Sequence, residues 1–180
     1  MKLRIGLLLI SALAFLSLVT ACDPGGPTNS PSAPPNTVAP SKVAGVLADS
    51  GFKAEITIAE PPTKLRVGQK EIITIKVKNI SDVIWYARGG EINNRQDNTF
   101  YIAAGNHWLD KDGKLTTAEE GHSGIPKDLK PGEDTAVTLQ ITAPKTPGEY
   151  ILDLDMVQEG VAWFREKGST TTKVKVEVVK

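Results

Sequence analysis

The feature that most constrains the fold is a period of two in the apolar residues between positions 51 and 180. Phe52, Ala54, Ile56 and Ile58 alternate with polar residues, a pattern typical of a strand with one buried face. The pattern recurs at 73–77, 137–141, 150–156 and 174–178, and shorter strands are expected at 83–86, 99–103, 107–109 and 161–164. Turn signals separate these segments, and helical periodicity is nearly absent. The sequence therefore predicts an all-β fold, an antiparallel sandwich of about seven to nine strands.

The first 22 residues have the organisation of an export signal. Lys2 and Arg4 precede an apolar run over 5–19, which is shorter than the roughly 20 residues that a membrane-spanning helix needs. The run ends in Val-Thr-Ala-Cys at positions 19–22, which resembles the lipobox of bacterial lipoproteins. The resemblance implies cleavage before Cys22 and a covalent lipid on its sulfur. The alternatives are an ordinary secretory signal with a chance cysteine, or an uncleaved anchor.

Cys22 is the only cysteine, so no disulfide can form within the chain and its stability must come from the core. Two or three acyl chains on one cysteine give stable attachment, whereas a single chain gives marginal binding. We therefore expect a chain anchored in the cell membrane or envelope and exposed on the extracytoplasmic side. Asp23 resembles an inner-membrane retention signal of some Gram-negative bacteria, and the choice between inner and outer membrane stays open.

Residues 22–50 are predicted to form a lipidated, disordered tether. This stretch is rich in proline and has almost no large apolar residue, so it cannot bury enough surface to fold. A packed segment at 43–47 is an alternative for its last part. The expected organisation is thus a signal peptide at 1–21, a tether at 22–50 and one domain at 51–180.

The charge balance argues against nucleic acid as a partner. The sequence has 21 basic and 21 acidic residues, and removal of residues 1–21 takes away Lys2 and Arg4. The mature chain therefore has a small acidic surplus, whereas nucleic-acid binding needs a basic one.

Two stretches resemble a bacterial immunoglobulin-like domain related to the four-tryptophan domain of selective-autophagy receptors. They are LRVGQKEIITIKVKNISDVIW at 65–85 and LKPGEDTAVTLQITAPKTPGEYILDLDMVQEGVAWF at 129–164. Of the four tryptophans, Trp85 and Trp108 match, whereas Ile75 and Leu154 occupy the other two positions. The resemblance implies an immunoglobulin-like sandwich, and bacterial domains of this kind are similar to accessory modules of envelope or carbohydrate-active proteins.

Three aromatic doublets suggest a binding surface, at 85–86, 100–101 and 163–164. Neighbouring residues of a strand point to opposite faces, so one ring of each doublet is expected outside. The candidate surface residues are Tyr86, Tyr101, Trp108 and Phe164, with Trp85 and Trp163 expected in the core. Clustered rings would make a platform for sugar rings or an anchor for a protein. The alternative is that the segment 88–105 covers them, or that they are scattered.

Other constellations favour simple structural roles. The segment 107–115 begins like a calcium loop but has glycine fourth, so an Asp112-Gly113 hairpin explains it better. The GHSG stretch at 121–124 lacks the last glycine of a nucleophile elbow and is expected to be a polar surface loop. His107 and His122, the only histidines, show no metal-binding spacing, so no metal is expected.

Asp153 and Asp155 are the one catalytic candidate. They share a strand face, with Glu159 following, and paired carboxylates can hydrolyse glycosides. A solvated strand face opposite Leu152, Leu154 and Met156 is the competing interpretation.

We therefore expect a non-enzymatic, membrane-anchored module that binds or adapts an envelope protein or a glycan, with no cofactor besides the lipid on Cys22. The alternatives are a structural spacer or subunit of an envelope complex, and a carboxylate-based glycoside hydrolase. The sequence leaves the oligomeric state open.

Overall fold

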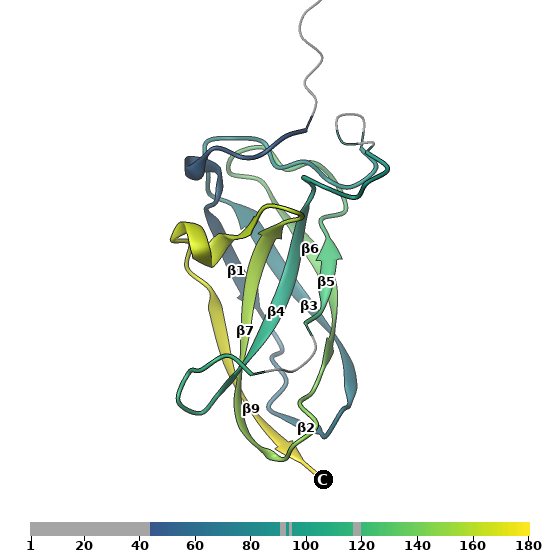
Figure 1. The fold of residues 1–180 in the computed structure, drawn as a ribbon, viewed down its shortest axis with the longest axis vertical. Coiled ribbons are helices and arrows are strands. Elements are labelled where there is room, and N and C mark those ends of the chain that lie inside the picture. The colour runs from purple at the N-terminus through teal and green to yellow at the C-terminus, as the bar shows by residue number, and fades with distance from the viewer. Residues whose placement is uncertain (1–43, 91–92, 94, 117–119) are drawn as a thin grey trace, which may run out of the picture. The chain divides into compact units, whose positions relative to one another are not determined.

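The computed structural model describes residues 44–90, 93, 95–116 and 120–180, and they form an immunoglobulin-like sandwich of two sheets (Figure 1). The first sheet has the order β1 (Ala54–Ile58), β3 (Lys70–Asn79), β6 (Asp134–Thr142). The second has the order β2 (Lys64–Arg66), β9 (Thr172–Val179), β7 (Gly148–Gln158), β4 (Ile102–Asp110), β5 (His122–Gly124), and β8 (Ala162–Trp163) also pairs with β7. The described residues thus contain nine strands, which confirms the predicted all-β fold.

Two short 3-10 helices complete the described structure, η1 (Asp49–Gly51) and η2 (Phe164–Lys167). Neighbouring strands are antiparallel with one exception, because β2 runs parallel to β9 and pairs Leu65 with Val178. No helix among the described residues has the length and apolar composition needed to cross a membrane.

The core lies between the sheets, where the alternating apolar residues meet. β3 contributes Ile73, Ile75 and Val77, while Leu152, Leu154 and Met156 come from β7. Three large rings fill the centre: Phe164 meets Phe52 and Trp85 edge to face, with ring centroids 5.1 and 5.2 Å apart. The period of two therefore predicts the core correctly in the long strands.

The short elements differ from the expectations. Residues 83–86 form no strand and contribute a single bridge between Trp85 and Leu129. The strands expected at 99–103 and 107–109 are one strand, β4, because Gly105 and Asn106 continue the ladder with β7. The segment 161–164 gives only the two residues of β8 before η2 begins, and β5 lies in the stretch expected to be a loop.

The folded unit begins before Gly51. Gln158 holds residues 44–50 to the sandwich: its Nε2 donates to the Gly45 carbonyl at 2.9 Å, and its Oε1 accepts from the N–H of Leu47 at 2.9 Å. Ala44 is buried as a result. These contacts agree with the alternative of a packed segment at 43–47 and not with a tether that begins only after residue 50. The buried Gln158 on β7 supplies the hydrogen bonds. The predicted signal peptide, Cys22 and the rest of the predicted tether lie outside the described residues.

Candidate binding surface on the second sheet

The outer face of β4 and β5 has a floor of small residues. Along β4 the side chains of Ile102, Ala104 and Trp108 enter the core, so Ala103 and Gly105 face outward. Gly105 pairs with His122 on β5, and Ala103 pairs with Gly124. Because three of these four positions carry little or no side chain, bulky groups can lie directly on the sheet.

The Trp163 ring lies on this floor. A Cβ added to Gly105 would stand 2.7 Å from the Cη2 atom of Trp163, so the ring touches the strand backbone. The rings of His107 and His122 contact it, with centroids 4.1 and 5.0 Å from that of Trp163. Trp163 is half-buried, and the prediction that it is a core residue is wrong.

The prediction that Phe164 is a surface residue is also wrong, because its side chain is 0% exposed. The reason is η2, which begins at Phe164 and turns its ring into the core. The carboxylate of Asp155 accepts the N–H of Arg165 at 3.2 Å, and that of Glu166 accepts the N–H of Trp163 at 3.1 Å. These bonds fix the turn that places Phe164 inside and Trp163 outside.

Tyr101 lies over the neighbouring floor position. Its ring carbons stand 3.5 and 3.6 Å from a Cβ built on Gly124, and it is half-buried. The Arg88 guanidinium lies 5.8 Å from its ring centroid. Burial, followed by the Glu159 carboxylate, raises the pKa of the Tyr101 phenol above its ordinary value, so the hydroxyl is a neutral donor.

The remaining two candidate surface residues, Tyr86 and Trp108, differ in exposure. Tyr86 is half-buried, and its carbonyl accepts the N–H of Ile102 at 2.9 Å, beside the start of β4. Trp108 is 1% exposed, with its ring 6.3 Å from that of Tyr150 in the core. The prediction that Trp108 is a surface residue is therefore wrong. Its side chain points to the same side of β4 as those of Ile102 and Ala104, which is the core side.

Two histidine–glutamate pairs border the rings. Nδ1 of His122 lies 2.8 Å from Oε1 of Glu159, and Nδ1 of His107 lies 2.7 Å from Oε1 of Glu120. The side chain of His122 is 35% exposed and that of Glu159 is 20% exposed, so the first pair is open to solvent. We call Tyr101, Trp163, His122 and Glu159, with the floor of Gly105 and Gly124, the Tyr101–Trp163 surface.

Asp153 and Asp155 do not lie on a solvated face, contrary to the competing interpretation of the sequence. They are 2% and 1% exposed, because β8 and η2 turn back over the outer face of β7. Asp153 lies 3.4 Å from the Arg165 guanidinium, and burial raises the pKa of Asp155 to about 6 despite the N–H groups of Met156 and Arg165 that bind it. Neither carboxylate opens into a cleft that could receive a glycosidic bond.

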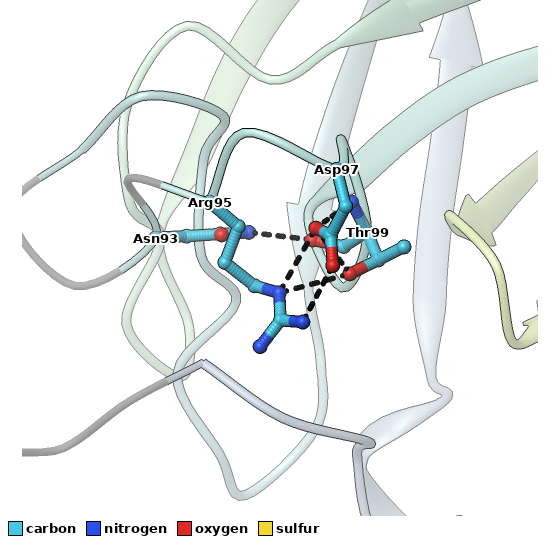
Figure 2. Close-up of polar contacts among 4 residues, drawn as sticks. All are labelled: Asn93, Arg95, Asp97 and Thr99. Atoms are coloured by element: carbon cyan, nitrogen blue, oxygen red, sulfur yellow. Dashed lines mark hydrogen bonds and ion pairs between the residues drawn. The ribbon is translucent and has the colours of Figure 1, made fainter.

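A loop next to the surface is fixed by its own polar side chains. Figure 2 shows the Arg95 guanidinium forked on the Asp97 carboxylate, with Nε–Oδ1 at 3.0 Å and Nη2–Oδ2 at 2.6 Å. The Thr99 hydroxyl donates to Asp97 at 2.8 Å, and the Asn93 amide donates to the Thr99 carbonyl at 3.1 Å (Figure 2). Arg95 and Thr99 hold the pKa of Asp97 well below its usual range. The Arg95 guanidinium also covers the Phe100 ring, 4.8 Å from its centroid.

The same loop enters β4 through a strained residue. Phe100 has a φ of 65°, which is unfavourable for a bulky side chain. Its N–H donates to the Glu159 carbonyl at 2.8 Å, and its carbonyl accepts from the Gln158 amide at 3.2 Å. These bonds maintain the strain and fix the backbone from which Tyr101 projects.

The other sequence motifs have structural roles. The 110–115 segment is a hairpin with Gly113 at a φ of 80°, and Oδ1 of Asp110 accepts the N–H groups of Asp112 and Lys114, as the turn interpretation predicted. The 121–124 stretch forms the edge strand β5 instead of a loop. Within the described part of the chain, no group of three or more His, Cys, Asp or Glu residues has the arrangement of a metal site.

A cleft of about 310 Å³ lies elsewhere, lined by Tyr150, Ile151 and charged residues of β7, β9 and the 110–115 hairpin. Two of those charged residues are already paired: Lys111 with Asp112 at 2.8 Å, and Glu177 with Lys64 at 3.0 Å. The Tyr101–Trp163 surface is therefore a stronger candidate for a binding site than this cleft.

Sequence reasoning missed Trp163, His122 and Glu159 as neighbours. The available signal was the small residues at 103–105 and 121–124, because glycine inside a strand often marks a close approach of another group. Nothing in the sequence indicated which group approaches.

No family model and no curated protein matches the sequence. Solved structures with a similar fold include a CARDB domain from Pyrococcus furiosus, in complex with di-metal ions, at 16% identity over 71% of this chain and 91% of that one, with a TM-score of 0.38. A sporulation control protein from Bacillus subtilis matches at 15% identity over 71% and 49%, with a TM-score of 0.40. A β-glucosidase from Listeria innocua matches at 16% identity over 71% and 16%, with a TM-score of 0.39. At these values the likeness concerns the fold alone.

Proposed function

We propose that this chain is a lipid-anchored, non-catalytic binding module of a bacterial envelope, and that it holds an envelope protein or glycan on the Tyr101–Trp163 surface. The observation that carries the proposal is the pair of half-buried rings laid on the glycine floor of β4 and β5. Tyrosine and tryptophan offer a large contact area with a polar atom, and they dominate the energetics of many binding surfaces.

The surroundings of the rings support binding. Trp163 is fixed by Gly105, His107 and His122, and Tyr101 follows a loop closed by the Arg95–Asp97 fork. Groups that are already ordered lose little conformational entropy when a ligand binds. The surface is therefore preorganised.

Attachment to the membrane is supported by the sequence. The lipobox-like residues 19–22 are followed by a proline-rich stretch that would act as a spacer. We expect Cys22→Ser to abolish fatty-acid labelling and to leave unprocessed precursor in the cell. Labelling equal to that of the wild type would contradict the anchor.

The binding proposal is tested by capture from native envelopes with the lipidated chain. We expect a defined partner that is retained by Leu115→Ala and reduced about tenfold or more by Trp163→Ala and by Tyr101→Ala. Leu115 is a matched control because it is 52% exposed on the 110–115 hairpin. Capture of the same material by all variants would refute the surface, and absence of any captured material would favour the spacer alternative.

A further inference from the structure

The two rings of the Tyr101–Trp163 surface lie over neighbouring positions on the outer face of β4 and β5. Trp163 covers Gly105, and Tyr101 covers Gly124, which pairs with Ala103. Ala103 and Gly105 are two residues apart on β4, so the two floor positions are separated by about 7 Å along the strand. That separation is comparable to the width of a pyranose ring, so a short oligosaccharide can contact both rings at once.

Hydrogen-bonding groups lie between and beside the rings. Glu159 interacts with Tyr101 electrostatically and pairs with His122, whose ring in turn meets Trp163 edge to face. The second ring nitrogen of His122 has no partner among the described residues. A carboxylate accepts hydroxyl protons, and an imidazole nitrogen exchanges a hydrogen bond with a hydroxyl in either sense. Apolar rings bordered by such groups match a sugar, which has a C–H face and a hydroxyl rim.

The charged side chains beside the rings favour neutral sugars over acidic ones. Glu159 belongs to this surface, and Glu120 pairs with His107 beside Trp163; 20% and 37% of their side chains are exposed. The Arg88 guanidinium lies over the Tyr101 ring. The carboxylates of Glu120 and Glu159 would repel the negative charges of an acidic glycan. The large exposed aliphatic residues of the described chain, Val46, Val67, Ile72, Ile80 and Leu115, all lie outside β4, β5 and β8, so the two rings are the apolar groups that this surface offers.

We propose that the Tyr101–Trp163 surface binds a neutral saccharide, with one sugar ring stacked on Trp163 and the next on Tyr101. This inference rests on the proposed binding function and names the ligand class of that same surface.

Trp163 supplies its own reporter for the test. Trp85 and Trp108 are 0% and 1% exposed, so a ligand on the surface perturbs the emission of Trp163 alone. The full mature chain is titrated with a glucose hexasaccharide and an N-acetylglucosamine hexasaccharide as neutral probes, and with a galacturonic acid hexasaccharide as the acidic probe. We expect a saturable change in emission with at least one neutral probe and none with the acidic probe.

Calorimetry on variants assigns the binding to the rings. We expect Trp163→Ala and Tyr101→Ala each to weaken the neutral probe about tenfold or more, with Leu115→Ala unchanged. Thermal melting of each variant checks that it is folded, and Tyr101→Phe, which keeps the ring, should retain most of the affinity. A preference for the acidic probe, or equal affinities in all variants, would overturn the inference.

The outcome also separates this inference from the function on which it rests. If none of the three probes binds while envelope capture still depends on Trp163, the ligand is not a neutral saccharide but the binding module stands. If the probes and the envelope both fail to bind, both proposals fall.

Discussion

At the scale of single residues, Gly105 does most to define the candidate surface. Because it has no side chain, the Trp163 ring can reach the backbone of β4. Gly105 pairs with Asp155 on β7 and with His122 on β5. A methyl group there would lie 2.7 Å from the Trp163 ring and 2.9 Å from the Gly121 carbonyl oxygen. Because one obstacle is backbone, the added atom cannot be relieved by turning a side chain alone.

We therefore predict that Gly105→Ala lowers the free energy of unfolding by about 1–3 kcal/mol, measured by urea denaturation. The same variant should raise the accessibility of Trp163 to a fluorescence quencher, since the ring must lift from the floor. Gly45→Ala is the control, because a Cβ at Gly45 meets nothing within 4 Å, and it should change neither quantity. A neutral Gly105→Ala would mean that Trp163 does not rest on the strand.

The aromatic doublets show what the alternation of residues can and cannot predict. The period of two predicts that Trp163 and Phe164 point to opposite sides, and they do. It does not say which of them enters the core, because that depends on where β8 ends and η2 begins. For the same reason the pattern does not tell which face of β4 carries Trp108. The residue is predicted on the surface, but it lies on the buried face.

At the scale of elements, η2 connects the core to the surface. It places Phe164 against Phe52 and Trp85, it brings Arg165 to Asp153, and its backbone is bound by Asp155. A sequence of alternating residues gives no warning of this element, since four residues of 3-10 helix are too short to show a period. The long strands, by contrast, repeat their pattern often enough to be predicted.

The buried carboxylate that binds η2 makes the stability pH-dependent. The pKa of Asp155 is about 6 in the folded chain against an ordinary value of 3.8, so the folded state binds a proton more tightly than the unfolded state. The resulting stabilisation is complete below about pH 4 and is lost as the pH rises through 6. Two pKa units correspond to about 3 kcal/mol.

We predict that the free energy of unfolding of Asp155→Asn, minus that of the wild type, increases by about 3 kcal/mol between pH 4 and pH 7. The asparagine has no proton to lose, and its side-chain oxygen can still accept the Arg165 N–H. Urea denaturation across this range measures the difference. Asp97→Asn should show no such slope, because the lowered pKa of Asp97 places its titration below pH 4. Parallel curves for Asp155→Asn and the wild type would contradict the account.

At the scale of the whole molecule, the fold was predictable and the surface was not. The sandwich follows from repeated local alternation, which each strand expresses independently. The Tyr101–Trp163 surface joins the start of β4, the edge strand β5 and the β7–β8 region, and no spacing along the chain encodes that juxtaposition. Gln158 is a similar case, because it extends the folded unit to residue 44 through contacts with residues more than a hundred positions away.

The central claim is that the rings over Gly105 and Gly124 are where this molecule meets its ligand. The most direct measurement is a binding isotherm of the full mature chain on isolated native envelope fragments, compared among the wild type, Tyr101→Ala, Trp163→Ala and Leu115→Ala. We predict that both ring variants bind about tenfold or more weakly while Leu115→Ala matches the wild type. Four superimposable isotherms from folded proteins would contradict the claim.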